Sequence, residues 1–365
     1  MYKKLTILLL LPFFALSFAA CESTTAPSMH IIDTTIVTKS DRALFALNEG
    51  AFGHSNGSLD VMLFHHTIRI HDSANFSDTT VIDTMYHTHR DVLTGLGLGN
   101  DILINGNQVV VLDNGSNQLI IVDADSLKQL TTIPLGLDAP SKMALIGPNL
   151  LLVTKRSATN AAIIDLTNNV VVDTIGIGEP SIAIAVLGNK AFVTSSAMSY
   201  AAPYHINVID VATRRIVNRY TIGGSPEQAL ADSANNQVIV GAPGDYVSFP
   251  VTFYFLNATT GALTDSVVAG SATDDAELTD GSEKFVIRGS DVFRPFGSSH
   301  QLGTKIISGG TSFYKGYFDA SLNALYLGKY DFTSSGQLYM YNPATGAIEN
   351  SFATGIAPAH FAFYH

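Results

Sequence analysis

The chain has 365 residues, of which 46% are hydrophobic and only 14% are charged, against roughly 25% charged in ordinary globular proteins. Its formal net charge of −11 argues against nucleic-acid binding, because that binding depends on Lys and Arg neutralising phosphates. The 30 glycines and the high apolar content favour many short strands that pack on both faces and are joined by tight turns.

The first 20 residues have the pattern of a secretory signal peptide. Two lysines precede an apolar run, residues 5–18, which is too short for a membrane span. The string Phe18-Ala19-Ala20-Cys21 contains the only cysteine of the chain and resembles a bacterial lipobox, in which the cysteine becomes the lipidated first residue. The sequence therefore predicts a signal peptide over residues 1–20, lipidation of Cys21 and a flexible tether over residues 21–40. A mature chain with one cysteine forms no internal disulfide and depends on core packing.

From residue 41 onward the chain repeats at intervals of about 40–47 residues. A short apolar run ending in Asp or Asn recurs at spacings of about 42, 45, 47 and 85 residues, and the last spacing is two periods. These runs end at Asp123, Asp165, Asp210, Asn257 and Asn342. A second marker, a tripeptide ending in proline, keeps a similar interval at Pro140, Pro180, Pro226 and Pro358. Each unit holds four apolar runs bounded by turn residues, which is typical of a β-propeller blade.

We count seven units and predict an all-β, seven-bladed β-propeller over residues 41–365. Units two to seven begin near Asp101, Ser141, Ser181, Glu227, Asp275 and Ser312. The first unit has only three runs, residues 44–47, 59–64 and 81–85. The C-terminal run, residues 359–364, is expected to be the innermost strand of blade one and to close the ring, which removes the open edges that promote aggregation. Unit six is poorly marked, so six or eight blades stay open as alternatives.

The connections after the second run of each unit are long, whereas those after the first and third runs are tight turns. In an up-and-down blade the loops after the second and fourth runs emerge on one face, and long loops of this kind usually carry function. The candidate ligand-binding residues on this face are Phe52, His54, Asn114, Lys155, Arg156, Tyr200, Tyr204, Tyr246, Phe249, Tyr330 and Phe332. The rings would supply apolar area, Asn114 an amide, and Lys155 or Arg156 a contact with phosphate. Packing of the loops themselves is the alternative for each residue.

Two further groups of polar residues are compatible with metal binding. His87 and His89 alternate along a predicted strand, which would place both imidazoles on one face, although a polar edge of blade one explains them more simply. Asp274, Asp275 and Glu277 could flank the central channel, as in propeller lactonases, with strand capping as the alternative. We therefore assign no metal site.

Some stretches of the first two units resemble a known family. Leu47-Asn48-Glu49-Gly50-Ala51-Phe52-Gly53 and Leu98-Gly99-Asn100-Asp101-Ile102 are similar to the opening blades of YncE-like surface lipoproteins, and the likeness spans most of residues 43–365. Within this group, BtuG-type proteins are seven-bladed propellers that capture cobalamin and pass it to a TonB-dependent outer-membrane transporter. The resemblance implies a protein held in the outer membrane by its lipid anchor, on the cell surface or on the periplasmic side, that binds cobalamin or another corrinoid. These motifs belong to the scaffold and do not identify the ligand.

Signatures of catalysis are scarce in the sequence. It has no Gly-x-Ser-x-Gly elbow and neither a Walker loop nor a His-Glu-x-x-His motif, and it has no tryptophan, which argues against the quinoprotein propellers. We expect a ligand-capture protein that is not an enzyme and holds no covalently bound cofactor. A lactonase-type propeller hydrolase and a protein–protein adaptor of a membrane complex are the alternatives.

Overall fold

The computed structural model describes residues 32–35, 42–65, 68–72, 77–81, 85–136, 139–198, 201–245, 247–297, 299–308, 310, 312–329 and 331–364. The described residues fall into two compact units, one within residues 1–38 and 67–82 and the other within residues 39–66 and 83–365. In the smaller unit, β1 (Ile32–Thr35), β4 (Ile68–Asp72) and β5 (Ser77–Val81) form an antiparallel sheet in the order β1-β4-β5. Strand β1 thus lies within the segment expected to be a tether. The expected signal peptide and Cys21 lie outside the described residues.

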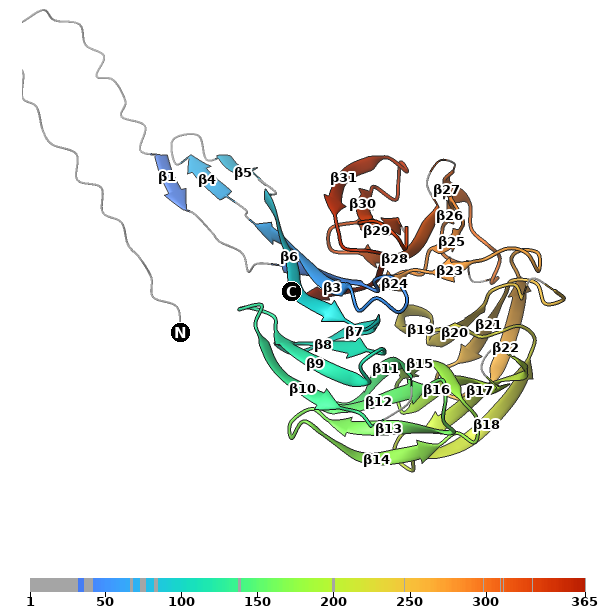
Figure 1. The fold of residues 1–365 in the computed structure, drawn as a ribbon. Coiled ribbons are helices and arrows are strands. Elements are labelled where there is room, and N and C mark those ends of the chain that lie inside the picture. The colour runs from blue at the N-terminus through green and yellow to red at the C-terminus, as the bar shows by residue number, and fades with distance from the viewer. Residues whose placement is uncertain are drawn as a thin grey trace, which may run out of the picture. The chain divides into compact units, whose positions relative to one another are not determined.

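The larger unit is a ring of seven sheets, which confirms the predicted seven-bladed β-propeller (Figure 1). From the axis outward, blade one contains β32 (Pro358–Tyr364), β2 (Arg42–Asn48), β3 (Gly57–His65) and β6 (Met85–Leu96). Blade two contains β7 (Gly99–Asn105), β8 (Gln108–Asp113), β9 (Gln118–Asp123) and β10 (Gln129–Pro134). Blade three contains β11 (Pro140–Gly147), β12 (Leu150–Lys155), β13 (Asn160–Asp165) and β14 (Val170–Gly176).

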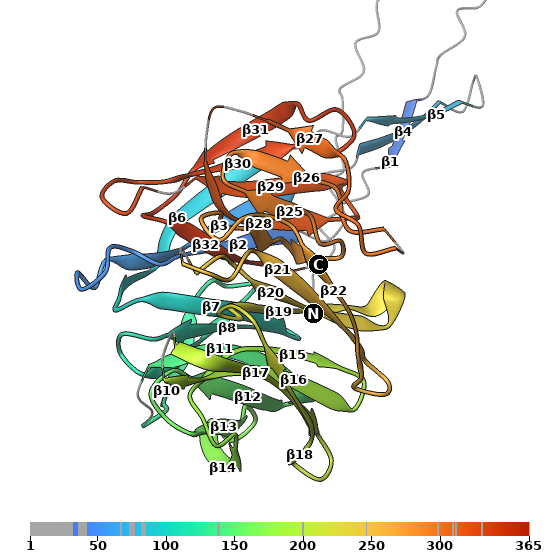
Figure 2. The same ribbon diagram turned by 90° about the vertical axis from the view of Figure 1, so that its right-hand side faces the viewer.

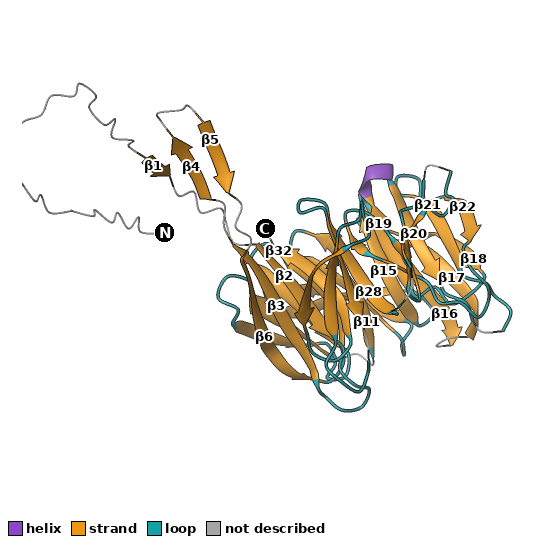
Figure 3. Cartoon of the chain, turned by 90° about the horizontal axis from the view of Figure 1, so that it is seen from above, coloured by secondary structure: helices purple, strands orange, loops and turns teal. Residues whose placement is uncertain are grey.

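The next two blades follow the same plan. Blade four contains β15 (Ser181–Leu187), β16 (Lys190–Met198), β17 (Ala201–Asp210) and β18 (Arg215–Ile222). Blade five contains β19 (Gln228–Asp232), β20 (Gln237–Ala242), β21 (Thr252–Asn257) and β22 (Leu263–Val268), with a 3-10 turn, η1 (Ser233–Asn235), between its first two strands. Among the described residues η1 is the only helical element (Figure 3). This part of the chain contains no helix that is long and apolar enough to cross a bilayer.

Blades six and seven share one irregular feature. Blade six has short strands, β23 (Glu277–Leu278), β25 (Val286–Arg288), β26 (Asp291–Phe293) and β27 (Lys305–Ile307). Blade seven contains β28 (Phe313–Asp319), β29 (Ala324–Lys329), β30 (Gln337–Tyr341) and β31 (Ile348–Ala353). Between β23 and β25 the chain forms β24 (Asp280–Gly281), which pairs in parallel with β28 of the next blade. The short strands explain why the repeat is poorly marked in unit six.

The C-terminal strand closes the ring, as the sequence predicted. Strand β32 pairs antiparallel with β2, from Tyr364 opposite Ala43 to Pro358 opposite Asn48. Each innermost strand contacts the innermost strands of the neighbouring blades, in the order β32, β7, β11, β15, β19, β23, β28 and back to β32. The blades therefore surround one axis without a gap, and the side view shows their sheets stacked face to face (Figure 2).

Burial explains the apolar runs of the sequence. The middle strands, such as β8 and β12, are buried on both faces because each sheet packs between two others. Seven apolar clusters fill the spaces between adjacent blades in the part of the chain that the structure describes. The cluster at the closure contains Phe64, Tyr326 and Phe363, and the rings of Phe64 and Phe363 stack at 5.5 Å. The outermost strands, such as β14, are largely exposed.

Two sequence expectations about strands and loops were wrong. The last strand of blade one is β6 (Met85–Leu96), not residues 81–85, and Val81 ends β5 in the smaller sheet. The apolar-run criterion missed β6 because an outermost strand faces water, and His89 and Arg90 on it are exposed. The connection between β26 and β27 in blade six, residues 294–304, is long, so the face expected to carry only tight turns also has an elaborate loop.

We expect Phe363→Ala to lower the free energy of unfolding by about 3–5 kcal/mol, the usual cost of truncating a buried phenylalanine. The ring is 7% exposed and belongs to the cluster that joins the last blade to the first. Urea denaturation measures the loss. Ile348→Ala on β31, where the side chain is 56% exposed, is the control and should cost less than about 1 kcal/mol. Equal costs for the two variants would show that β32 does not stabilise the ring.

Candidate functional site

The central cavity on the face of the long loops is the main candidate site, and we call it the funnel. Its volume is about 720 Å³, within the usual range for small-molecule sites. The mouth is formed by loops after second strands and by connections between blades, and the floor by the first residues of the innermost strands. Residues that line the funnel include Glu49, Phe52, Asn100, Asn114, Lys142, Arg156, Tyr204, Ser225, Glu227, Asp245, Asp275, Glu277, Tyr314, Lys315 and His360.

A side hollow of about 370 Å³ adjoins the funnel between blades one and two. The two cavities share Phe52, Leu98, Asn114 and Ala139. The hollow depends on the close approach of Gly97 and Gly115, since a Cβ atom on Gly97 would lie 2.8 Å from the Gly115 backbone. A ligand larger than the funnel can therefore extend sideways under the exposed ring of Phe52, which is 86% exposed.

A layer of charged side chains separates the funnel from a second cavity of about 360 Å³ deeper in the channel. Four residues line both cavities, and we call them the girdle: Lys142, Glu227, Lys315 and His360. Besides the girdle, the deeper cavity is lined by both polar and apolar residues of the innermost strands and the adjoining β24, among them Asp101, Ile184 and Asp280. The girdle residues therefore face both cavities of the channel.

Lys142 and His360 form one half of the girdle. The Lys142 ammonium donates to the Asn100 carbonyl at 2.7 Å and lies 3.8 Å from Asp101 Oδ1 and 3.1 Å from His360 Nδ1. The ammonium also lies 3.3 Å from His360 Nε2, and this nitrogen lies 3.4 Å from Glu49 Oε1. Burial and the charge of Lys142 lower the pKa of His360 to about 4, which keeps the ring neutral at pH 7. Burial raises the pKa of Asp101 to about 6, against the opposing charge of Lys142.

Lys315 and Glu277 form a buried ion pair on the opposite side of the channel. The Glu277 Oε2 atom is buried and has no hydrogen-bond partner. Burial raises the pKa of Glu277 to about 7, opposed by Lys315 and reinforced by the charges of Asp275 and Glu227. Burial lowers the pKa of Lys315, but the charge and hydrogen bond of Glu277 together with the charges of Glu49 and Glu227 outweigh it, so the net shift of this pKa is upward. The ammonium stays charged at pH 7, whereas the carboxylate is poised between its two states.

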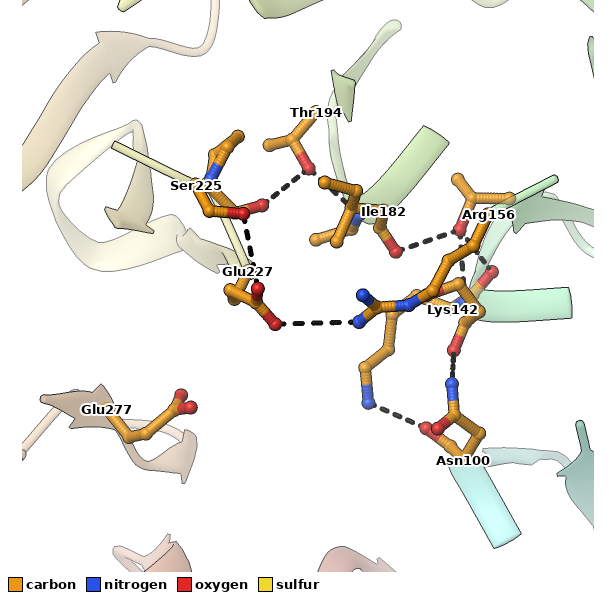
Figure 4. Close-up of polar contacts among 12 residues, drawn as sticks. Asn100, Lys142, Arg156, Ile182, Thr194, Ser225, Glu227 and Glu277 are labelled. Atoms are coloured by element: carbon orange, nitrogen blue, oxygen red, sulfur yellow. Dashed lines mark hydrogen bonds and ion pairs between the residues drawn. The ribbon is translucent and has the colours of Figure 1, made fainter. Parts of the chain in front are cut away.

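Charge is divided across the funnel. The carboxylates of Glu227, Asp245, Asp275 and Glu277 come from blades five and six and the connections that lead into them, whereas Lys142 and Arg156 come from blade three. The two sides meet where Arg156 Nη2 lies 3.5 Å from Glu227 Oε2, and Ser225 donates to the other oxygen of Glu227 at 3.2 Å. Figure 4 shows these side chains pointing toward one another, with the Glu277 carboxylate aimed at the open centre.

Threonines on second strands hold the innermost strands of adjoining blades in place. Thr154 Oγ1 accepts the Lys142 N–H at 3.0 Å and contacts the Ile182 carbonyl at 3.2 Å. Thr194 Oγ1 accepts the Ala183 N–H at 2.9 Å and donates to the Pro226 carbonyl at 2.8 Å, directly before Glu227. These bonds fix the starts of the inner strands of blades three, four and five, and therefore help to orient Lys142 and Glu227.

Four of the residues predicted from the sequence line the funnel: Phe52, Asn114, Arg156 and Tyr204. Phe332 is 40% exposed and packs edge-on against the funnel residue Tyr314, with ring centres 5.6 Å apart. Phe249 packs edge-on against Tyr204 at 6.5 Å and against Gly223, behind the wall. These contacts place most of the predicted aromatic side chains that are described in or beside one cavity.

Two further predicted residues that the structure describes, His54 and Lys155, are not in the lining. His54 is exposed on the Phe52 loop, and Lys155 is only 7% exposed at the end of β12, where its N–H donates to Ser181 Oγ. Tyr200, Tyr246 and Tyr330 lie outside the described residues. Asp275 and Glu277 line the funnel as the channel hypothesis expected, whereas Asp274 accepts the Ser271 N–H in its own turn. Among the described residues no three His, Cys, Asp or Glu side chains are grouped as metal ligands.

Sequence reasoning missed the charged floor of the funnel, including Lys142, Lys315 and His360. A usable signal was present, because the proline-ended marker directly precedes an innermost strand in blades three, four, five and one. The second residue after Pro140 is Lys142 and the second after Pro358 is His360. A charged side chain at the start of an otherwise apolar inner run therefore indicates a channel-facing residue.

No family model and no curated protein matches the sequence. Among solved structures, the fold is similar to Kuenenia stuttgartiensis hydrazine synthase, with a TM-score of 0.58 and 13% sequence identity over 72% of this chain and 89% of that one. At this identity the similarity supports the propeller fold alone.

We expect the stability of the wild-type protein, relative to Glu277→Gln, to fall as the pH rises from 5 to 8. The pKa of Glu277 is raised to about 7 in the folded state, so ionisation of this carboxylate costs folding free energy above its unfolded pKa, up to about 3 kcal/mol. Glutamine does not titrate, so the variant lacks this contribution. Urea denaturation of both proteins at several pH values measures the difference, and a difference independent of pH would contradict the assignment.

Proposed function

We propose that this chain is a lipid-anchored ligand-capture protein that holds its ligand in the funnel. The observation that carries this proposal is the cavity itself, about 720 Å³ with a side hollow of about 370 Å³, open on the face of the long loops. The exposed ring of Phe52 stands at the mouth, and polar side chains form the floor. An apolar wall with a few directed polar groups is typical of a site that binds an organic molecule.

We further propose that the ligand is cobalamin or another corrinoid, delivered to a TonB-dependent outer-membrane transporter. The support for the ligand is the resemblance to BtuG-type proteins together with the chemistry of the lining. A corrinoid has apolar faces, amide arms and a nucleotide phosphate. Phe52 and Tyr204 suit the faces, the amide oxygen of Asn114 suits an amide N–H, and Arg156 suits the phosphate. The side hollow gives such a large ligand room to extend beyond the funnel.

We expect purified protein to bind cobalamin with one-to-one stoichiometry in isothermal titration calorimetry, and Phe52→Ala to weaken the binding about tenfold or more. Burial of a large apolar side chain contributes about 1.5–3 kcal/mol, and the ring of Phe52 is 86% exposed in the free protein, so its loss should leave the fold intact. Leu130→Ala removes a side chain that is 55% exposed on the outermost strand of blade two and should bind like the wild type.

If titration with cobalamin and with other corrinoids gives no binding heat, the corrinoid part of the proposal is contradicted. Wild-type affinity in Phe52→Ala would instead show that the ligand does not enter at the mouth of the funnel. The two results separate the identity of the ligand from the position of its site.

We expect Cys21→Ser to release the protein from the membrane fraction of bacteria that express the full chain, because the lipid is the expected anchor. Membrane fractionation with immunoblotting measures the distribution. Persistence of the variant in the membrane fraction would contradict lipid anchoring at this residue.

A further inference from the structure

The floor of the funnel contains an incompletely satisfied carboxylate. Glu277 begins the innermost strand β23, and one carboxylate oxygen is engaged by Lys315. The other oxygen, Oε2, is buried without a hydrogen-bond partner. A buried acceptor of this kind is costly unless something donates to it. The terminal torsion of a glutamate is broad, and Figure 4 shows the Glu277 carboxylate pointing toward the open centre of the funnel.

The surroundings of Glu277 carry more negative than positive charge. Asp275 on its own blade and Glu227 at the start of blade five both act on it electrostatically. From blade seven, Lys315 is its one counter-charge and the hydroxyl of Tyr314 is bound to Glu49. Arg156 is already paired with Glu227. Around Glu277, the described part of the funnel therefore has three carboxylates, those of Glu277, Asp275 and Glu227, and two cations, Lys315 paired with Glu277 and Arg156 paired with Glu227.

The chemistry that fits this arrangement is an N–H donor that brings a positive charge. A metal ion is a poor fit, because the described residues contain no group of three acidic or histidine side chains close enough to share one. Aromatic rings of Tyr204 and Tyr314 line the same cavity, and the Lys315 ammonium already lies 5.3 Å from the centre of the Tyr314 ring. Rings of this kind attract organic cations and pack against their carbon atoms.

We propose that the floor of the funnel is a subsite for a protonated primary amine, which donates to the Glu277 carboxylate between Asp275 and Glu227. This proposal rests on the proposed function only in that the funnel is the ligand site. It does not require the ligand to be a corrinoid. The amine supplies the hydrogen bond that Glu277 Oε2 lacks and a third positive charge for three carboxylates that share two cations.

A series of three small probes tests the subsite on the purified protein by calorimetry or by ligand-observed NMR. Benzylamine carries both the charge and the N–H donors, benzyltrimethylammonium carries the charge alone, and benzyl alcohol is the neutral analogue. We expect benzylamine to bind about tenfold more tightly than benzyl alcohol, because hydrogen bonds to charged groups are stronger than neutral ones, and benzyltrimethylammonium to lie between them. Equal affinity for benzylamine and benzyl alcohol, or binding of neither, would overturn the proposal.

The release of protons on binding can be measured in the wild-type protein, without any variant. Binding of a cation favours the ionised state of Glu277, whose pKa is about 7 in the free protein. Benzylamine should therefore displace protons at pH 7, detected as binding heats that differ between buffers of different ionisation enthalpy, and its affinity should rise from pH 6 to pH 8. Affinity that falls or stays constant over this range would contradict a role for Glu277.

Glu277→Gln should remove both the preference for benzylamine over benzyl alcohol and the release of protons. Glu179→Gln is the matched control, because Glu179 pairs with His205 at 2.8 Å in a network between blades three and four, outside the funnel lining. This control should keep both properties. The experiment distinguishes this proposal from the corrinoid proposal. Binding of cobalamin without binding of benzylamine would contradict only the amine subsite, and binding of benzylamine without binding of cobalamin would contradict only the corrinoid.

Discussion

The pairing of the last strand with the second strand of the chain is the interaction on which the rest of this protein depends. Strand β32 lies beside β2 over its whole length and beside the innermost strands of blades two and seven. Without it, blade one would lack its inner strand and the cluster around Phe64 and Phe363 would face water. Because every blade packs against two others, the closure also determines the geometry of the blades far from it in sequence.

Closure brings the starts of seven inner strands to one axis, and this convergence creates the electrostatics of the site. Lys142, Lys315 and His360 are far apart along the chain, yet they line the same layer of the channel. Burial there penalises charge, so each ion must find a partner within the layer. The His360 ring remains neutral beside Lys142, and Glu277 titrates near neutral pH beside Lys315. The unequal division of charge across the funnel follows from which blades supply the acids and which the bases.

The candidate site was only partly predictable, because the rim and the floor of the funnel have different sequence patterns. Part of the rim lies on irregular loops that stand out in a chain of tight turns, so Phe52 and Arg156 were found from loop position alone. Tyr204 was also assigned to a loop and lines the funnel, but it lies in β17. The floor consists of single charged residues within apolar runs, and each run looks like ordinary core. Lys155 shows the opposite error, since it lies at a loop yet points into a buried environment at the end of β12.

The sequence by itself determined the propeller class, the approximate start of each blade and the strand that closes the ring, because sheets buried on both faces require apolar runs that recur at a fixed interval. It favoured seven blades, and the structure decided against six or eight. The outermost strand β6 was not predicted, because a strand that faces water does not need apolar residues. Only the tertiary structure decided which carboxylate oxygen of Glu277 lacks a hydrogen-bond partner and where positive and negative charges face each other. Those properties arise from distances between residues of different blades, and no local pattern encodes them.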